Sequence, residues 1–224
     1  MSLAEALTHE RLDPRPLFGG RYVILERTMA SDRDVIDAVL RGDIERYAEL
    51  VDRYRPAALR LAFSMLGNYE DAKDASQEAF VNAYRSLRRF RSGAKFSTWL
   101  YRIVVNECKD VYRQRSRQPI AVLRVGEPDP EDEGGSLFLD VADPAASPAE
   151  RLADRELGQR LSAAVGRLPM KQRTAFVLHH LHGLTLEEVA NAMQCRLGTV
   201  KSHVFRAMEQ LRTQLGPWPV EEGA

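Results

Sequence analysis

The sequence predicts an all-α protein made of two small helical domains joined by a flexible acidic linker. Apolar residues recur at helical spacing from Asp32 to about Gln118 and again from Ala149 to Leu215, and no stretch alternates as a strand does. Between these regions lies a segment with five prolines and three glycines. With 224 residues, the chain is long enough for each half to bury a core.

The first 31 residues predict a loose arm, because they hold two prolines, the Gly19–Gly20 pair and one short apolar run. After the arm, breaks at Gly42, at Gly67–Asn68 and at Ser92–Gly93 delimit helices. Four are expected, at Asp34 to Arg41, Ile44 to Leu66, Tyr69 to Phe90 and Phe96 to Arg115.

Residues 118–148 have the composition of a linker, too polar and too broken to pack as a domain. The helical pattern resumes at Ala149 and runs to Leu215, with breaks at Leu168–Pro169, His182–Gly183 and Arg196 to Gly198. The expected organisation is an arm (1–31), a helical domain (32–117), the linker (118–148), a second helical domain (149–216) and a tail (217–224).

The charges balance, with 32 Lys and Arg against 32 Asp and Glu, but they are segregated along the chain. Residues 83–117 hold ten basic and two acidic residues, a net of +8, and residues 167–212 hold seven against three, a net of +4. Residues 118–158 hold three against ten, a net of −7. Basic segments on helical domains indicate a nucleic-acid partner.

Cysteine and histidine spacing predicts neither a disulfide framework nor a metal site. Cys108 and Cys195 are far apart, and no acid or cysteine is spaced to complete a tetrahedral site with His179, His180 and His182. No cofactor is therefore expected. A chain with no long apolar run and no signal pattern is expected in the cytoplasm.

The stretch from Gly183 to Leu215 has the layout of a helix-turn-helix. Thr185 is a suitable N-cap, and Glu188 stands three residues later, where a capping box places its carboxylate. After a short turn, a second helix is expected to open at Thr199, and its first residues would enter the major groove. The candidates for base and phosphate contacts are Thr199, Lys201, Ser202, His203 and Arg206. The alternative is a helical hairpin with a merely solvated polar face.

A second candidate nucleic-acid surface lies around Gly93, where basic residues alternate with aromatic residues. This pattern is typical of proteins that bind single-stranded nucleic acid. These residues are Arg88, Arg89, Phe90, Arg91, Lys95, Phe96, Ser97 and Trp99. The helix that follows carries Arg102, Asn106, Lys109 and Arg113 on one side, which suits a helix laid against duplex DNA. The alternative is that the rings belong to the core, which for Trp99 alone is the better interpretation.

The preceding helix carries an acidic and amide-bearing face formed by Glu70, Asp74, Gln77, Glu78 and Asn82. Such a face would repel DNA, so a protein is its expected partner, with a solvated surface as the alternative.

The segment from Asp71 to Asp110 and the segment from Leu168 to Arg212 together resemble the extracytoplasmic-function sigma factors of bacteria, within the sigma-70 family. The resemblance covers roughly residues 34–117 and 149–215, both domains in the right order. It implies a sigma-2-like domain followed by a sigma-4-like domain. It also implies a protein that binds core RNA polymerase, directs it to promoter DNA and performs no chemistry of its own. An anti-sigma factor is a further implied partner.

The resemblance also implies residue roles. Asp74, Gln77 and Glu78 would dock on the clamp helices of core polymerase. The loop from Phe90 to Ser97 would capture a flipped base of the −10 element, and Arg102, Asn106 and Lys109 would hold the duplex just upstream. The second helix of the helix-turn-helix would read the −35 element. The family commonly has Arg where this chain has His203.

Two other classes of protein compete with this interpretation. An autonomous helix-turn-helix regulator would carry a ligand-sensing domain, which has no need of the basic aromatic loop. A metal-dependent nuclease would bring its carboxylates into one basic pocket, whereas here they lie in the linker and on a separate helix face.

Overall fold

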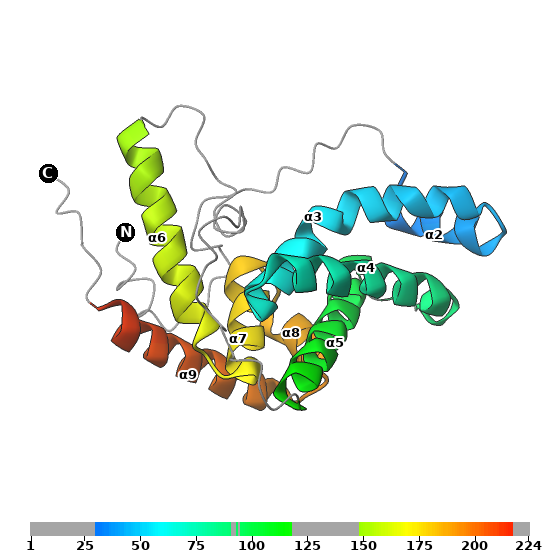
Figure 1. Ribbon diagram of the computed structural model, residues 1–224. Helices are drawn as coiled ribbons and strands as arrows, with labels where there is room; N and C mark the ends of the chain where they lie inside the picture. The colour runs from blue at the N-terminus through cyan, green and yellow to red at the C-terminus, as the bar shows by residue number, and fades with distance from the viewer. Residues whose placement is uncertain (1–29, 91–92, 94, 118–147, 217–224) are drawn as a thin grey trace, which may run out of the picture.

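The computed structural model describes residues 30–90, 93, 95–117 and 148–216. All regular elements within these ranges are helical, which confirms the all-α prediction (Figure 1). Residues 1–29 of the expected arm, the expected tail and all but the last residue of the expected linker lie outside the described residues. No helix within the described ranges is long and apolar enough to cross a bilayer.

The described residues between 30 and 117 form four α-helices: α2 (Asp32–Leu40), α3 (Tyr47–Leu66), α4 (Tyr69–Ser86) and α5 (Phe96–Arg117). The two middle helices expected from sequence are each subdivided, because Ile44–Arg46 and Leu87–Arg89 adopt tighter 3₁₀ turns. The first helix begins two residues earlier than expected, because Ser31 and Asp34 form a capping box around its first turn.

The junction of α3 and α4 follows from two adjacent residues. Gly67 ends α3 in the left-handed conformation at φ 70°, which a residue without a Cβ adopts at no steric cost. The Asn68 side chain then accepts a hydrogen bond from the Asp71 backbone N–H at 3.0 Å and starts α4. Small residues of α4, namely Ala72, Ala75, Ala79 and Ala83, are all buried, so α3, α4 and α5 pack closely against one another.

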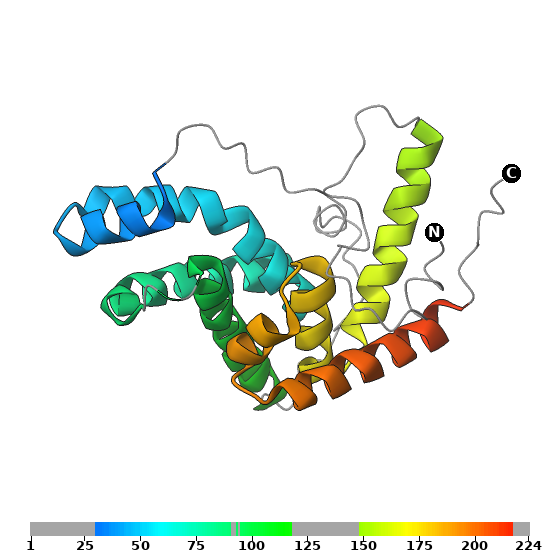
Figure 2. The same cartoon turned by 180° about the vertical axis from the view of Figure 1, so that it is seen from behind.

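The C-terminal part holds α6 (Pro148–Gly166), α7 (Met170–Phe176), α8 (Leu186–Met193) and α9 (Leu197–Leu215). A π-helical turn over Val177–Leu181 extends α7, where the sequence predicts an ordinary helix. The breaks expected at Leu168–Pro169 and His182–Gly183 lie between these elements. Of the break expected at Arg196 to Gly198, only Arg196 lies between elements, because α9 already begins at Leu197. Seen from either side, α9 runs beneath α6 and α7, and α8 lies beside α5 (Figures 1 and 2).

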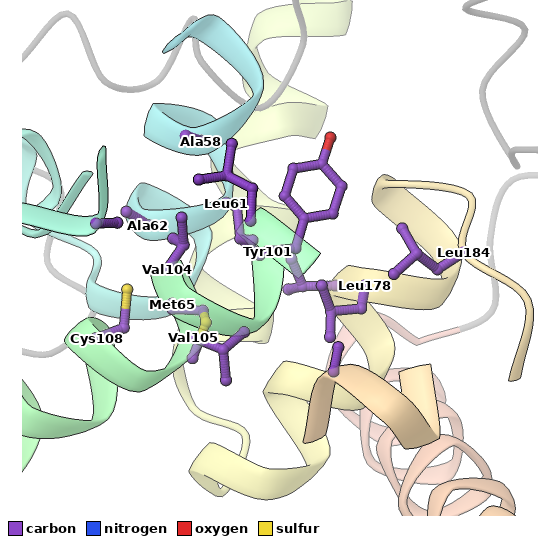
Figure 3. Close-up of a cluster of buried hydrophobic side chains, with 14 of the residues drawn as sticks. Ala58, Leu61, Ala62, Met65, Tyr101, Val104, Val105, Cys108, Leu178 and Leu184 are labelled. Atoms are coloured by element: carbon purple, nitrogen blue, oxygen red, sulfur yellow. The ribbon is translucent and has the colours of Figure 1, made fainter. Parts of the chain in front are cut away.

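The two parts share one hydrophobic core. Buried side chains of α3 (Leu61 and Met65) and of α5 (Tyr101 and Val105) form a cluster with Leu178 and Leu184 of the C-terminal part (Figure 3). The sequence predicts a separate core for each half. The structure instead joins them, because α3 and α5 present apolar side chains to the C-terminal helices as well as to each other.

Candidate nucleic-acid interface

The helix-turn-helix forms as the sequence predicts, with one shift. The Thr185 hydroxyl accepts from the Glu188 N–H at 3.2 Å, and the Glu188 carboxylate accepts from the Thr185 N–H at 2.9 Å, which completes the capping box. Gln194 ends α8 at φ 55°, a left-handed conformation that turns the chain toward α9. The second helix begins at Leu197, two residues before Thr199, so Thr199 lies in its first turn.

The candidate reading residues lie on the outer side of α9. Thr199, Lys201, Ser202 and Arg206 are exposed, whereas Val200, Val204, Ala207 and Leu211 are buried on the opposite side. The Ser202 hydroxyl donates to the Gly198 carbonyl at 3.0 Å, a bond that a DNA acceptor could replace. The outer side of α9 is therefore open to a groove of duplex DNA.

His203 differs from the other four, because its side chain is half-buried and its buried Nδ1 atom has no hydrogen-bond partner among the residues that the structure describes. Burial lowers the pKa of His203, and the positive charges of Lys171 and Arg206 lower it further. Protonation would also bury an N–H donor that has no acceptor. At neutral pH the ring is uncharged and cannot act as the cation that an arginine supplies.

An exposed aromatic residue on α9 falls outside the sequence prediction. Phe205 is 67% exposed and stands one turn after Ser202, beside Arg206. The exposure of Phe205 could have been predicted from the sequence, because position 205 lies outside the apolar stripe of α9.

The aromatic residues that precede α5 pack on one another. The ring centroids of Phe90 and Trp99 lie 5.3 Å apart, and those of Phe90 and Phe96 lie 5.8 Å apart. Phe96 is 2% exposed and also meets Tyr54 of α3, so its ring belongs to the core and is not presented to a base. Phe90, Ser97 and Trp99 are half-buried, and Arg91 lies outside the described residues.

The polar side of α5 is only partly exposed to solvent. Arg102, Asn106 and Lys109 are all half-buried, and burial lowers the pKa of Lys109. Lys95, just before α5, is exposed and pairs with Glu188 of α8 at 3.0 Å. The C-terminal part thus lies against two of the cations that the sequence singles out for DNA.

The acidic and amide face of α4 is solvent-exposed at Asp74, Gln77 and Glu78. Among the described residues, Glu78 pairs with Arg85 of the same helix, over a long distance of 3.7 Å. Asn82, which the sequence places near this face, instead donates to Glu107 of α5 at 3.0 Å. The exposed face therefore ends before Asn82.

The histidines after α7 serve the fold. His179 Nδ1 lies 2.7 Å from the Leu184 carbonyl, so this nitrogen carries the proton and donates. The His182 ring packs edge-on against Tyr101 of α5 at 5.3 Å. Within the described ranges, no three His, Cys, Asp or Glu side chains gather as metal ligands would.

Comparison with known proteins identifies the family. The family description for sigma-70 region 2 matches residues 50–118, and that for sigma-70 region 4 matches residues 158–211. These two regions are the ones that hold α5 and the helix-turn-helix. The chain belongs to the sigma-70 family of transcription initiation factors.

Three relatives that match over nearly their whole length show to which group within the sigma-70 family the chain belongs. The RNA polymerase sigma-H factor of Pseudomonas aeruginosa is 34% identical over 190 residues, which are 85% of this chain and 96% of that protein. The ECF RNA polymerase sigma factor SigW of Bacillus subtilis is 35% identical over 80% of this chain and 94% of its own. The ECF RNA polymerase sigma-E factor of Escherichia coli is 33% identical over 87% and 94%. The chain is an extracytoplasmic-function sigma factor, which directs promoter recognition at transcription initiation.

Solved structures share the fold. CnrH in complex with the cytosolic domain of CnrY has a TM-score of 0.57 at 23% identity, covering 82% of this chain and 96% of CnrH. The sigma factor RpoE from Bartonella quintana, in complex with the anti-sigma factor NepR, has a TM-score of 0.58 at 24% identity, covering 75% and 96%.

Proposed function

We propose that this sigma factor divides promoter recognition between two surfaces, with α9 reading the −35 element and the region around α5 reading the −10 element. The observation that carries the first half is the sidedness of α9. Thr199, Lys201, Ser202 and Arg206 are exposed on one side while the opposite side is buried, as a helix lying in the major groove requires. His203 contributes as an uncharged hydrogen-bonding group.

The −10 surface would combine Lys95 and Arg91 with the half-buried rings of Phe90 and Trp99, while Phe96 supports these rings from the core. Ser97 adds a hydroxyl at the start of α5. Arg102, Asn106 and Lys109 would hold the duplex just upstream through its phosphates and one base edge.

The exposed face of α4 is the proposed docking site for core polymerase. Asp74 and Glu78 supply negative charge and Gln77 supplies an amide, a combination that suits a basic and polar protein surface better than DNA. The proposed boundaries of the polymerase-binding domain are residues 32–117, and those of the −35-binding domain are residues 149–216.

The protein would act without chemistry of its own, in the cytoplasm, where its polymerase partner is found. An anti-sigma factor is the proposed regulator, since two sigma factors of the same fold were solved with the partners named above. The acidic segment 118–148 is the proposed connection between the domains.

The proposal is tested by dependence on core polymerase. Transcripts made by the chain with bacterial core enzyme on a genomic library would define its promoters, and footprints on one such promoter would then be compared with and without core. Protection of both elements only with core is expected, because each surface is small and gains from being held beside the other. Tight and sequence-specific protection by the chain alone would favour an autonomous regulator.

A further inference from the structure

Two polar contacts join α4 to α5 at points that lie well apart along both helices. The Asn82 side-chain amide donates to Glu107 Oε1 at 3.0 Å, and both side chains are half-buried. The Arg115 guanidinium pairs with the Asp71 carboxylate, and these side chains are half-buried too. The first turn of α4 therefore meets the last turn of α5, and the two helices pack antiparallel (Figures 1 and 2).

The separation of the two contacts determines how α5 lies on α4. The stretch of α4 from Asp71 to Asn82 is about 16 Å long, and the stretch of α5 from Glu107 to Arg115 is about 12 Å long. Hydrogen bonds to charged groups are directional and hold only over a narrow range of distance. One such contact fixes the axial position of α5 along α4, and the second also fixes the angle between the helices.

The apolar packing of α4 defines its axial position less sharply. Apart from Phe80, the buried side chains of α4 are small: Ala72, Ala75, Ser76, Ala79 and Ala83. Small side chains form shallow ridges, which permit a close approach of two helices but resist sliding weakly. The polar contacts therefore decide the register of α4 on α5.

Each member of the Asn82–Glu107 pair stands beside one of the proposed binding surfaces. Asn82 comes one turn after Glu78 of the α4 docking face, and Glu107 directly follows Asn106 of α5. If α4 docks on core polymerase and α5 holds promoter duplex, the register of the two helices sets where the DNA lies relative to the polymerase.

From these contacts we infer that Asn82 and Glu107 are positioning residues, which hold the promoter-contacting side of α5 in one register with the polymerase-docking face of α4. The inference rests on the proposed function of these two surfaces. Each side chain acts through the helix that carries it and touches neither DNA nor polymerase. Without the pair, both surfaces keep their own residues, but the −10 element is no longer held at one distance from the polymerase active site.

The test reverses the polarity of the pair. Asn82→Asp replaces the amide donor by a carboxylate that repels Glu107. The double variant Asn82→Asp/Glu107→Gln restores one donor and one acceptor with their roles exchanged. Gln114→Glu is the matched control, because it makes the same amide-to-carboxylate change at an exposed site of α5. Circular dichroism and urea unfolding check that each full-length variant is folded.

The position of the first transcribed nucleotide reports the register. Each variant is combined with core polymerase at saturating concentration, and start sites on one promoter are mapped by primer extension. We expect Asn82→Asp to spread the start over neighbouring positions and to form about ten-fold fewer open complexes by permanganate reactivity, the effect of losing one hydrogen bond to a charged group. The double variant should recover the wild-type pattern, and all variants should bind core equally. A merely destabilised fold would lower the amount of transcript without moving its start.

Wild-type start sites and opening in folded Asn82→Asp would overturn the inference. A defect that the double variant does not recover, or that Gln114→Glu shares, would overturn it as well. If Asn82→Asp does not fold, Asp71→Asn tests the other contact, because it removes the charge that pairs with Arg115, and it should spread the start sites in the same way. Unchanged start sites in that variant would then overturn the inference. Absence of promoter-specific transcription by the wild type with core would instead remove the proposed function.

Discussion

His203 lies among the proposed −35-reading residues, and its environment sets the charge of its ring. The ring stands between exposed reading residues, yet one nitrogen is buried and two cations lie nearby. All three factors favour the neutral imidazole. The proposed −35 surface therefore carries one positive charge fewer at neutral pH than the same surface would with an arginine at position 203.

Substituting His203→Arg should strengthen −35 binding and steepen its dependence on salt. One added phosphate contact changes the slope of log affinity against log salt by about 0.9. The measurement is promoter affinity of the reconstituted holoenzyme between 50 and about 200 mM salt. The control is Gln214→Arg on the last turn of α9, which adds the same charge at an exposed site. Equal slopes for the two variants would contradict a phosphate contact at position 203.

Phe90 and Phe96 should behave differently although both belong to one aromatic cluster. Phe96→Ala removes a buried ring and should cost about 3–5 kcal/mol in the free energy of unfolding. Phe90→Ala removes a half-buried ring, so a smaller loss of stability is expected together with a defect in strand opening. Urea unfolding measures the first effect, and permanganate reactivity of the melted promoter measures the second. Normal opening by folded Phe90→Ala would remove Phe90 from the −10 surface.

At the scale of elements, helix starts and buried stripes could be predicted closely from the sequence. The capping box of α8 needs only Thr185 and Glu188 at the right spacing, and both bonds are present. The π-helical turn after Phe176 could not be predicted, because the backbone hydrogen bond that widens it, from the His182 N–H to the Val177 carbonyl at 3.0 Å, leaves no signal in the residue types. Asn82 was misplaced for a similar reason, since its partner Glu107 lies on another helix.

The exposed face of α4 supports a prediction about assembly. Glu78→Lys should weaken binding to core polymerase without unfolding the chain, because Glu78 is exposed and its ion pair among the described residues is a long one within its own helix. Asp52→Lys makes the same charge change at an exposed site on α3. Pull-down with core enzyme compares the two variants, and circular dichroism checks their helical content. If both retain wild-type affinity, the α4 face is only a solvated surface.

At the scale of the whole molecule, the sequence shows which side chains are basic or aromatic, but it does not show how one half of the chain packs on the other. The sequence around Lys95 predicts that this side chain binds DNA. Nothing in that sequence indicates that Glu188, 93 positions away, is its ion-pair partner. Arg173 reads as one more basic residue of a DNA-binding domain, yet it is buried against a carbonyl of α3. Contacts between distant parts of the chain leave no periodic signal.

The packing of the two halves should respond to mild acid. Burial lowers the pKa of His182 to about 3 and that of His180 to about 4, with Arg60 and His179 respectively as the neighbouring groups that add to the effect. Both pKa values are below the ordinary 6.5, so the unfolded chain binds more protons than the folded chain below that pH. Stability present above about pH 6.5 is therefore lost as the pH falls, by up to about 1.4 kcal/mol per pH unit for each histidine.

Urea unfolding at pH 7.5, 6.5 and 5.5 would measure this loss. The range stays above the ordinary pKa of the carboxyl groups, which limits their contribution. His182→Gln should flatten the pH dependence by about one proton, because it removes one of the two titrating rings. An unchanged slope in that variant would show that His182 is not the group responsible.

Because both helical halves of the chain contribute to one hydrophobic core, the protein should stay assembled when the chain is cut between them. If a protease site were introduced within residues 118–147 and cut, the two fragments should stay together through the cluster around Leu61, Tyr101 and Leu178, without any peptide bond between them. Once the tether is gone, their association becomes a concentration-dependent equilibrium, so dilution alone should release them. Size-exclusion chromatography across a dilution series would then give the strength of the contact directly, and fragments that separate even when concentrated would show that the tether alone keeps the halves together.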